Sequence, residues 1–216
     1  MSSRPTGVLL LLVYALVFLT PGFFTLPPLD RDESRFAQAT KQMLQTGDPV
    51  EIRFQDTARN KKPVGIYWMQ AASAAALGGP EAAPIWAYRI PSALGALLAI
   101  VFTYLAGAAL LDRRTAAIGA AILALSMLLV AEGHIAKTDA VMCAAITAMM
   151  AGLARAYMRQ LGHPGAPGRL SDALLIGGGL GVSALVKVPV GLMVGGLAVL
   201  ALWAQGGGIS WLRRTR

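Results

Sequence analysis

Long apolar runs, most of them about twenty residues or more, constrain this chain more than any other feature of its sequence. They alternate with short polar stretches that hold most of the charged residues, which make up only 14% of the 216 positions. A helix of about 20 residues is long enough to cross the ~30 Å hydrocarbon core of a bilayer. The sequence therefore predicts an all-α membrane protein, a polytopic helical bundle, and argues against one or two soluble domains.

We expect about six membrane spans. Four of them cover residues 7–26, 85–111, 116–133 and 140–157. The apolar stretch 172–203 is too long for one span, and Lys187 and Pro189 interrupt it, so we expect two helices that meet at 186–189. The first run is longer than the apolar core of a signal peptide and lacks a small-x-small cleavage site after it, which favours an uncleaved helix.

The distribution of basic residues favours one orientation of these spans. With the N-terminus in the cytoplasm, the inner segments hold nine basic and two acidic residues, and the outer segments hold ten basic and nine acidic. Cytoplasmic loops of membrane proteins carry such an excess of Lys and Arg. We therefore expect both termini in the cytoplasm, with a basic tail at 205–216. Topology also accounts for the net charge of +8, so we expect no nucleic-acid partner, which would need a clustered basic face.

The longest polar segment, residues 29–68, follows the first span. Asp30 and Glu33 have the D-x-x-E spacing of a capping box, which predicts a helix that begins near Arg31. Apolar residues then recur at helical spacing up to Gly47, a natural C-cap residue. This pattern predicts an amphipathic helix that lies on the membrane surface.

The rest of the polar segment is less regular. Residues 46–62 have no helical period, and we expect irregular structure there. An apolar helix of about 13 residues should begin at Gly65. It is too short to span a bilayer comfortably, so we expect a re-entrant or interfacial helix that pairs with the amphipathic one in the first outer loop.

Ionisable side chains recur at three separate places on the predicted outer face: the loop 30–62, the polar break 132–139 and the break 186–189. An ionisable group at membrane depth is costly, so by default it marks a functional site. We expect the following residues to converge: Asp32, Arg35, Lys62, Asp139 and Lys187.

Several short motifs, taken in order, resemble the bacterial lipid-linked sugar transferases of glycosyltransferase families 39 and 83. These families include the protein O-mannosyltransferases and the aminoarabinose transferase of lipid A. The motifs are Asp32-Glu33-Ser34-Arg35-Phe36-Ala37, Gly47-Asp48, Lys62-Pro63, Tyr67-Trp68, Arg89-Ile90-Pro91, Lys137-Thr138-Asp139 and Lys187-Val188-Pro189. The resemblance implies a GT-C fold, with residues 1–204 as the N-terminal part of its transmembrane domain and 27–80 as an outer catalytic loop.

The resemblance also implies a function. A glycosyltransferase of this kind moves a sugar from a polyprenyl-phosphate donor to a lipid or protein acceptor, on the periplasmic face of the bacterial inner membrane. Asp32 would then be the catalytic or acceptor-orienting carboxylate, and Asp139 would act near the acceptor. The donor phosphate would be held by Arg35, Lys62 and Lys187, with Glu33, Arg89 and Lys137 as further candidates.

The chemistry of these residue types suits the same function independently. A carboxylate can act as a base toward an acceptor hydroxyl or amine. Arg matches phosphate as a planar fork and Lys as a point charge, and both stabilise the charge that builds on a departing phosphate. One branch of the family has a metal-linked acidic residue just before the loop lysine. Lys61 stands there in this chain, so we assign no metal ligand and no certain cofactor.

Other interpretations stay open. Members of the family usually run to about twice this length, so the chain could be a fragment or a short paralogue, active or only lipid-binding. A transporter or flippase would have paired discontinuous helices in matching halves, and only the break at 187–189 suggests one. Among the candidate residues, Asp30 could be a helix cap, Asp32 and Arg35 an ordinary surface pair, and Lys187 a side chain that snorkels from a helix end. Glu132 and His134 are metal-ligand types without a third partner.

Overall fold

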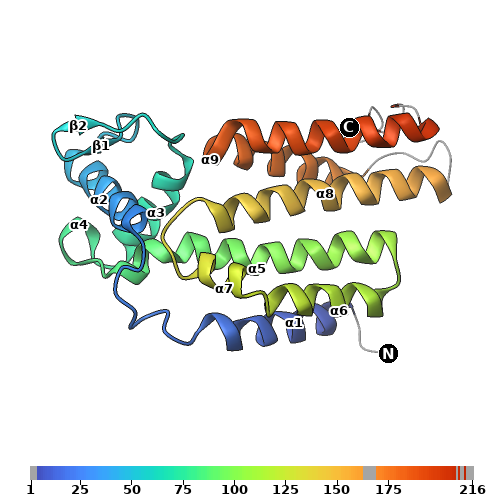
Figure 1. Cartoon of the computed structure of the whole chain (residues 1–216), viewed down its shortest axis with the longest axis horizontal. Helices are drawn as coiled ribbons and strands as arrows, with labels where there is room; N and C mark the ends of the chain where they lie inside the picture. Colours follow the sequence, from blue (N-terminus) through green and yellow to red (C-terminus); the bar gives the residue numbers. More distant parts are fainter. Residues whose placement is uncertain (1–3, 163–168, 208, 210–211, 213–216) are drawn as a thin grey trace.

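The computed structural model describes residues 4–162, 169–207, 209 and 212. Long helices form a bundle, with a smaller region of short elements at one end (Figure 1). The helices are α1 (Arg4–Leu19), α2 (Arg31–Thr46), α3 (Gly65–Ala76), α4 (Gly79–Ala82), α5 (Ile85–Leu110), α6 (Arg113–Ala124), α7 (Met127–Gly133), α8 (Asp139–Gly162), α9 (Leu170–Leu202) and the π-helical turn η1 (Trp203–Gly207). Two short strands, β1 (Arg53–Phe54) and β2 (Thr57–Ala58), pair antiparallel.

Three helical segments are long and apolar enough to cross a membrane, namely α5, α8 and Leu170–Gln205, which contains α9 and a kink within it. The number rises to four if α6 and α7 are taken as one bent span. These counts rest on the length and composition of the described residues alone. The chain is a multi-pass membrane protein, as its apolar runs predict, while the count of six spans stays a prediction.

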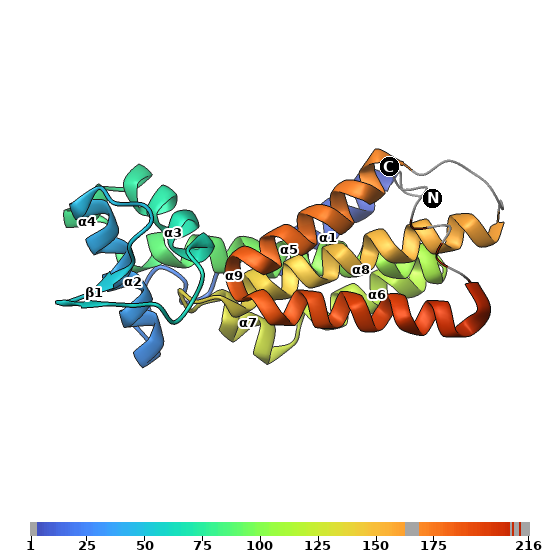
Figure 2. The ribbon, with the colours of Figure 1, turned by 90° about the horizontal axis from the view of Figure 1, so that it is seen from above.

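The last long helix, α9, is two helices that fold back on each other. Its backbone leaves the helical region at Lys187, where φ is −164° and ψ is 82°. Pro189 lacks the N–H that a helix would use to bond the Leu185 carbonyl, so the helix cannot continue through this point. Figure 2 shows the two halves as the arms of a V that meets near the short elements. The predicted junction at 186–189 is confirmed.

Two of the predicted spans differ from the structure. The first helix, α1, ends at Leu19 and not near residue 26, because Pro21 and Gly22 follow and Gly22 adopts a left-handed φ of +79°. The third predicted span is broken, since Ser126 is extended and α6 meets α7 at an angle of 62°. Apolar content continues across both breaks, so hydropathy alone did not reveal them.

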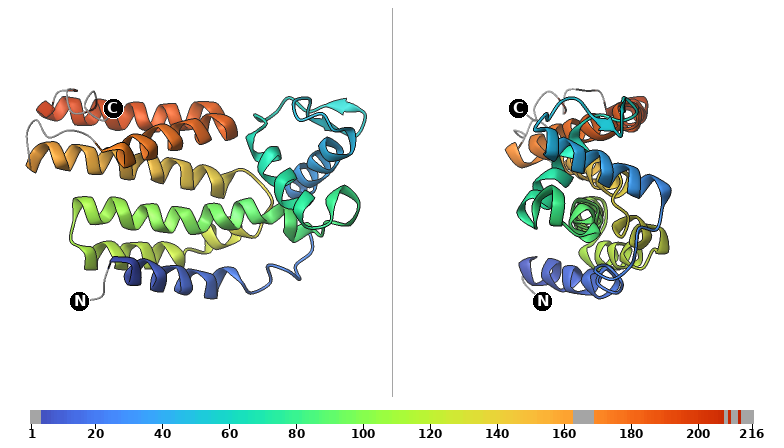
Figure 3. Two further views of the ribbon diagram at one scale, coloured as in Figure 1. Left: turned by 180° about the vertical axis from the view of Figure 1, so that it is seen from behind. Right: turned by 90° about the vertical axis from the view of Figure 1, so that its left-hand side faces the viewer.

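The amphipathic helix α2 has the predicted ends. It begins after Asp30, whose side chain accepts a hydrogen bond from the Asp32 N–H at 3.1 Å, and it ends at Gly47, where φ is +70°. Its buried face packs against α3, and the Thr40 hydroxyl donates to the Gln70 side chain at 2.8 Å between them. The predicted pairing of these two helices is therefore confirmed, while their place on the outer side of the membrane stays a prediction. Figure 3 shows α2 lying across the end of the bundle, transverse to the long helices.

The segment between α2 and α3 is more ordered than its sequence predicts. Residues 53–58 form the β1–β2 hairpin, where we expected irregular structure. Gln55 takes a left-handed φ of 56° in the turn. The Gln42 side chain of α2 bonds both backbone groups of Gln55, at 2.8 and 3.1 Å. Strands of two residues are too short to show a period in the sequence, and α2 supplies the contacts that hold the turn.

Small residues bring the long helices into close contact. A Cβ added at Gly95 of α5 would lie 2.8 Å from the Ala140 backbone of α8. One added at Gly179 of α9 would lie 2.5 Å from the Ala145 carbonyl oxygen, also of α8. Such close backbone approach is typical of helices that pack within a membrane. It fixes α8 between α5 and α9, so that the first residue of α8, Asp139, lies beside the break of α9.

Candidate active site

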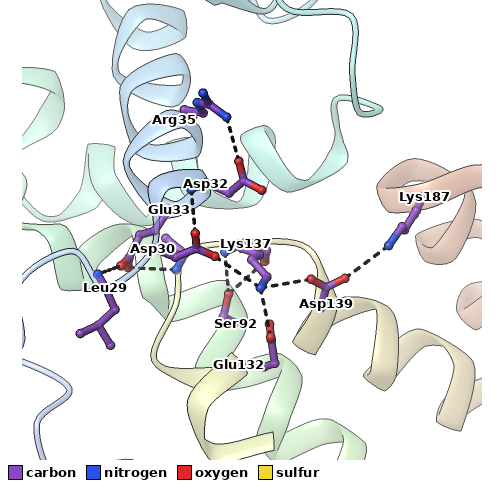
Figure 4. Close-up of polar contacts among 11 residues, drawn as sticks. Leu29, Asp30, Asp32, Glu33, Arg35, Ser92, Glu132, Lys137, Asp139 and Lys187 are labelled. Carbon is purple, nitrogen blue, oxygen red and sulfur yellow. Dashed lines mark hydrogen bonds and ion pairs between the residues drawn. The ribbon is translucent and has the colours of Figure 1, made fainter. Parts of the chain in front are cut away.

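Ionisable side chains from three separate parts of the chain gather where α2, α8 and the break of α9 meet (Figure 4). The first turn of α2 carries Asp32 and Arg35. The segment between α7 and α8 carries Lys137, and α8 begins at Asp139. Lys187 comes from the break of α9.

Lys137 links these parts. Its ammonium nitrogen lies 3.1 Å from Glu132, 3.6 Å from Asp139 and 3.7 Å from Asp30. Burial lowers the pKa of the Lys137 amine, but the hydrogen bond to Glu132 and the charges of the three carboxylates outweigh burial and raise that pKa above its ordinary value. Lys137 is therefore a stable cation that joins the N-cap of α2 to the start of α8.

Asp139 is shared by two lysines. One carboxylate oxygen lies 3.6 Å from Lys137 and the other lies 3.5 Å from Lys187. The carboxylate also sits at the N-terminus of α8, where the helix dipole favours a negative charge. Asp139 and Lys187 are each more than a third exposed, at 40% and 38% of their side chains. Both lysines are paired with Asp139, so a phosphate that binds them has to take the place of this carboxylate.

Asp32 and Arg35 form a separate, exposed pair. The Arg35 guanidinium lies 3.3 Å from the Asp32 carboxylate, and half of the Asp32 side chain is exposed. An exposed pair three residues apart on a helix contributes only a few tenths of a kcal/mol. The pair therefore contributes little to the stability of the fold, and both side chains are accessible to a substrate.

Two of the further candidates lie inside the protein. The side chains of Glu33 and Arg89 are fully buried and form an ion pair, with the Arg89 Nε 2.7 Å from Glu33. Arg89 also donates to three backbone carbonyls of the segment that follows α1, those of Phe23, Leu26 and Pro27. These groups are closed to a substrate. They connect the start of α2 to α5, which is a structural role that sequence alone did not distinguish from phosphate binding.

Glu33 has further partners that fix it in place. Its second oxygen accepts from the Leu29 N–H at 2.7 Å, and its first accepts from the Ala136 N–H at 3.1 Å. The predicted capping box is thus formed with a shifted partner, since Glu33 reaches back to Leu29 and not to the N-cap residue Asp30. Buried charges need such complete pairing, because an unpaired one is costly.

Lys62 lies partly buried at the end of the loop, next to Pro63 and the start of α3. No carboxylate of the described residues lies within ion-pairing distance of it. The sequence reasoning missed a neighbour, Arg59, whose Nε donates to the Tyr67 hydroxyl at 3.1 Å. The signal that could have revealed Arg59 is the density of charge, because residues 59–62 hold three basic side chains in four positions.

Among the described residues, the side chains around the site do not form a set of metal ligands. Lys61 and Lys62 supply no ligating oxygen at the loop position. Within the ranges that the structure describes, no three His, Cys, Asp or Glu side chains group together to hold a metal. Glu132 pairs with Lys137, and the two ring nitrogens of His134 lie 2.8 and 3.0 Å from the carbonyl oxygens of Val130 and Pro21.

The sequence of this chain is similar to one known protein family and to several known proteins. The sequence profile described as dolichyl-phosphate-mannose-protein mannosyltransferase matches residues 8–214. The undecaprenyl phosphate-alpha-4-amino-4-deoxy-L-arabinose arabinosyl transferase of Yersinia enterocolitica is 30% identical over 92% of this chain and 34% of its own length. The protein of the same name from Pectobacterium carotovorum is 32% identical over 67% of this chain and 25% of its own length.

Solved structures show the same fold. The crystal structure of ArnT from Cupriavidus metallidurans in the apo state aligns with a TM-score of 0.80 and 24% identity, over 99% of this chain and 38% of that one. The structure of the same protein bound to undecaprenyl phosphate aligns with a TM-score of 0.74 and 23% identity. The fold is therefore the GT-C type that the motifs imply. The chain spans about a third of the length of the first curated relative that it matches.

Proposed function

Because this chain belongs to the dolichyl-phosphate-mannose-protein mannosyltransferase family, we propose that it acts as a glycosyltransferase with a polyprenyl-phosphate-linked sugar as donor and a lipid or protein as acceptor. The observation that carries the proposal is the meeting of Asp139, Lys137 and Lys187 beside the exposed Asp32–Arg35 pair. The names of the relatives support a donor of the undecaprenyl-phosphate class. Residues 1–204 would form the N-terminal part of the transmembrane domain, with 27–80 as its outer catalytic loop.

In the proposed reaction, a hydroxyl or amine of the acceptor attacks the anomeric carbon of the donor sugar. The Asp32 carboxylate orients this nucleophile and accepts its proton, which general-base chemistry allows for an exposed carboxylate. The bond between the anomeric carbon and the phosphate oxygen breaks with inversion, and its electron pair stays on the polyprenyl phosphate.

The cations of the site would stabilise the leaving group. Arg35 and Lys187 are each paired with a carboxylate, Asp32 and Asp139, at 3.3 and 3.5 Å. The two carboxylates hold these cations in place before the donor arrives. The donor phosphate would then replace the carboxylates as the anionic partner of the cations. Lys62 adds a positive charge that no described carboxylate neutralises. Preorganised charges of this kind lower the barrier because they need no rearrangement as the phosphate becomes more negative.

An apolar groove of about 610 Å³ suits the polyprenyl chain. It lies between α3, α5, α8 and the first half of α9, and Ser73 contributes the one polar side chain among its described lining residues. Val141 and Val182 line it, close in sequence to Asp139 and Lys187. The donor would then place its phosphate at the cations and its chain along the helices.

The proposal includes an orientation in the bacterial inner membrane. The site end carries the mixed charges of the outer segments. The turn between α5 and α6 and the C-terminal end of α8 lie at the other end of the bundle (Figure 1). By the positive-inside rule, the site faces the periplasm and both termini face the cytoplasm. The basic tail of this topology falls mainly on residues 208, 210–211 and 213–216, which lie outside the described ones.

A donor-hydrolysis or transfer assay tests the proposal. The purified chain, given radiolabelled polyprenyl-phosphate sugar and acceptor-containing membranes, should release polyprenyl phosphate. Asp32→Asn should abolish the release, whereas Asp56→Asn, which neutralises an exposed carboxylate of the same loop, should not. A wild-type chain that binds the donor but releases no polyprenyl phosphate would refute the proposed transferase activity. The chain would then be a lipid-binding protein.

A further inference from the structure

The segment 59–62 is the most positive part of the site end. It carries Arg59, Lys61 and Lys62 and no acidic residue. Among the described residues, no carboxylate lies within ion-pairing distance of these three. The other cations of the site differ, since Arg35 and Lys187 each have a carboxylate partner. The segment therefore presents positive charge that an anion from outside the chain can neutralise.

Several contacts with the rest of the fold hold Arg59 in place. Its backbone N–H donates to the Ile52 carbonyl at 2.7 Å, and its Nε donates to the Tyr67 hydroxyl at 3.1 Å. Its guanidinium lies over the rings of Phe36 and Phe54, with 5.3 and 5.8 Å to the centroids. Phe36 follows Arg35 on α2, so the stacked guanidinium lies beside the helix that carries the candidate catalytic carboxylate.

The terminal nitrogens of Arg59 remain available, which sets it apart from two other arginines of this region. Arg89 donates through all three of its nitrogens to protein acceptors. Arg53 uses both terminal nitrogens, on Glu51 and on the Asp56 carbonyl. Arg59 uses only Nε on Tyr67, and within the described part of the chain its Nη1 and Nη2 have no acceptor. An arginine with a purely structural role would be expected to use its terminal nitrogens as Arg89 does.

We infer that Arg59 is a ligand of the donor phosphate, which its free Nη1 and Nη2 bind as a fork while Tyr67 and the two phenylalanine rings hold the guanidinium in place. A planar guanidinium matches two phosphate oxygens at once, and its delocalised charge tolerates stacking on aromatic rings. This inference rests on the proposed function, because it assigns one more binding group to the same donor. Tyr67 is in this account a positioning residue for Arg59.

Binding of a polyprenyl phosphate to the full chain in phosphatidylcholine nanodiscs tests the inference. Arg59→Gln should weaken binding about tenfold, the effect of losing one charge-assisted hydrogen-bonded group. Arg59→Lys should recover part of the affinity, because it keeps the charge but not the fork. Tyr67→Phe should weaken binding by a smaller factor. Arg53→Gln is the matched control in the same loop and should bind as the wild type does.

Thermal unfolding of each variant shows whether the loop is still folded, and Arg59→Lys keeps the test informative if Arg59→Gln unfolds it. A second series, in nanodiscs that contain phosphatidylglycerol without polyprenyl phosphate, separates the donor from the membrane as the source of the phosphate. Loss of polyprenyl-phosphate affinity with unchanged phosphatidylglycerol binding supports the inference. Equal loss for both lipids overturns it, because Arg59 would then be a general contact to anionic lipid.

The inference and the proposed function fail in different ways. If Lys62→Gln weakens polyprenyl-phosphate binding and Arg59→Gln does not, then the assignment of Arg59 is wrong and the proposed function stands. If the wild-type chain does not bind polyprenyl phosphate at all, the proposed function fails and the inference fails with it.

Discussion

Replacing Glu33 with Gln should destabilise this protein far more than any change at the neighbouring Asp32. The Glu33 carboxylate and the Arg89 guanidinium are both fully buried and lie 2.7 Å apart. Glu33→Gln keeps the shape of the side chain but leaves the Arg89 charge without a counter-ion. Removing one partner of a buried pair costs about 3–5 kcal/mol. We expect a loss of that size in the free energy of unfolding.

The matched control is Asp32→Asn on the same turn of α2. It breaks the exposed pair with Arg35, and surface pairs contribute about 0–1 kcal/mol.

Equilibrium unfolding in mixed micelles measures both differences, and hydrogen exchange of the α2 amides reports whether the start of that helix opens first. The reasoning would be refuted if Glu33→Gln and Asp32→Asn cost the same.

Three further predictions concern other parts of the structure. The pKa of the Lys137 amine is raised from its ordinary value of 10.5. The ion pairs of Lys137 therefore stabilise the fold fully below pH 10.5, and this contribution is lost as the pH rises through the pKa of the folded state. Lys137→Met should flatten this alkaline loss of stability in a pH series of thermal unfolding. Gly179→Ala should destabilise the bundle by about 1–3 kcal/mol because of overpacking against the Ala145 carbonyl, whereas Gly181→Ala, with nothing within 4 Å of its added Cβ, should be neutral or stabilising in the same unfolding assay. Lys187→Met should weaken polyprenyl-phosphate binding about tenfold without a comparable loss of stability, since the pair it breaks is exposed, and equal binding by the variant would remove Lys187 from the phosphate site.

Features that depend on a few neighbouring residues were readable from the sequence. The ends of α2 follow from Asp30 and Gly47, and the junction within α9 follows from Pro189. In each case the backbone chemistry of one residue decides the outcome, because a cap, a left-handed φ or a missing N–H acts within one turn of helix. The apolar runs likewise predicted a multi-pass helical protein, since a bilayer demands helices of fixed length.

Features that join distant residues needed the structure. The sequence placed Glu33 and Arg89 among the possible binding groups, and only the fold shows that they are buried against each other. The same holds for the break between α6 and α7, where no Gly or Pro interrupts an apolar run, and for Arg59, whose stacking on Phe36 and Phe54 depends on the hairpin.

The sequence by itself therefore determined the helical membrane class of this protein, the helix ends and breaks that a single residue sets, and the kinds of side chain offered at one end of the bundle. Tertiary structure decided which of those side chains are exposed and which are buried. The physical reason is that local backbone preferences act over a few residues. The burial and pairing of a charge instead depend on which other segments the packed helices bring within about 4 Å of it. Asp32 and Glu33 are adjacent in the sequence, yet one is half exposed and the other is fully buried.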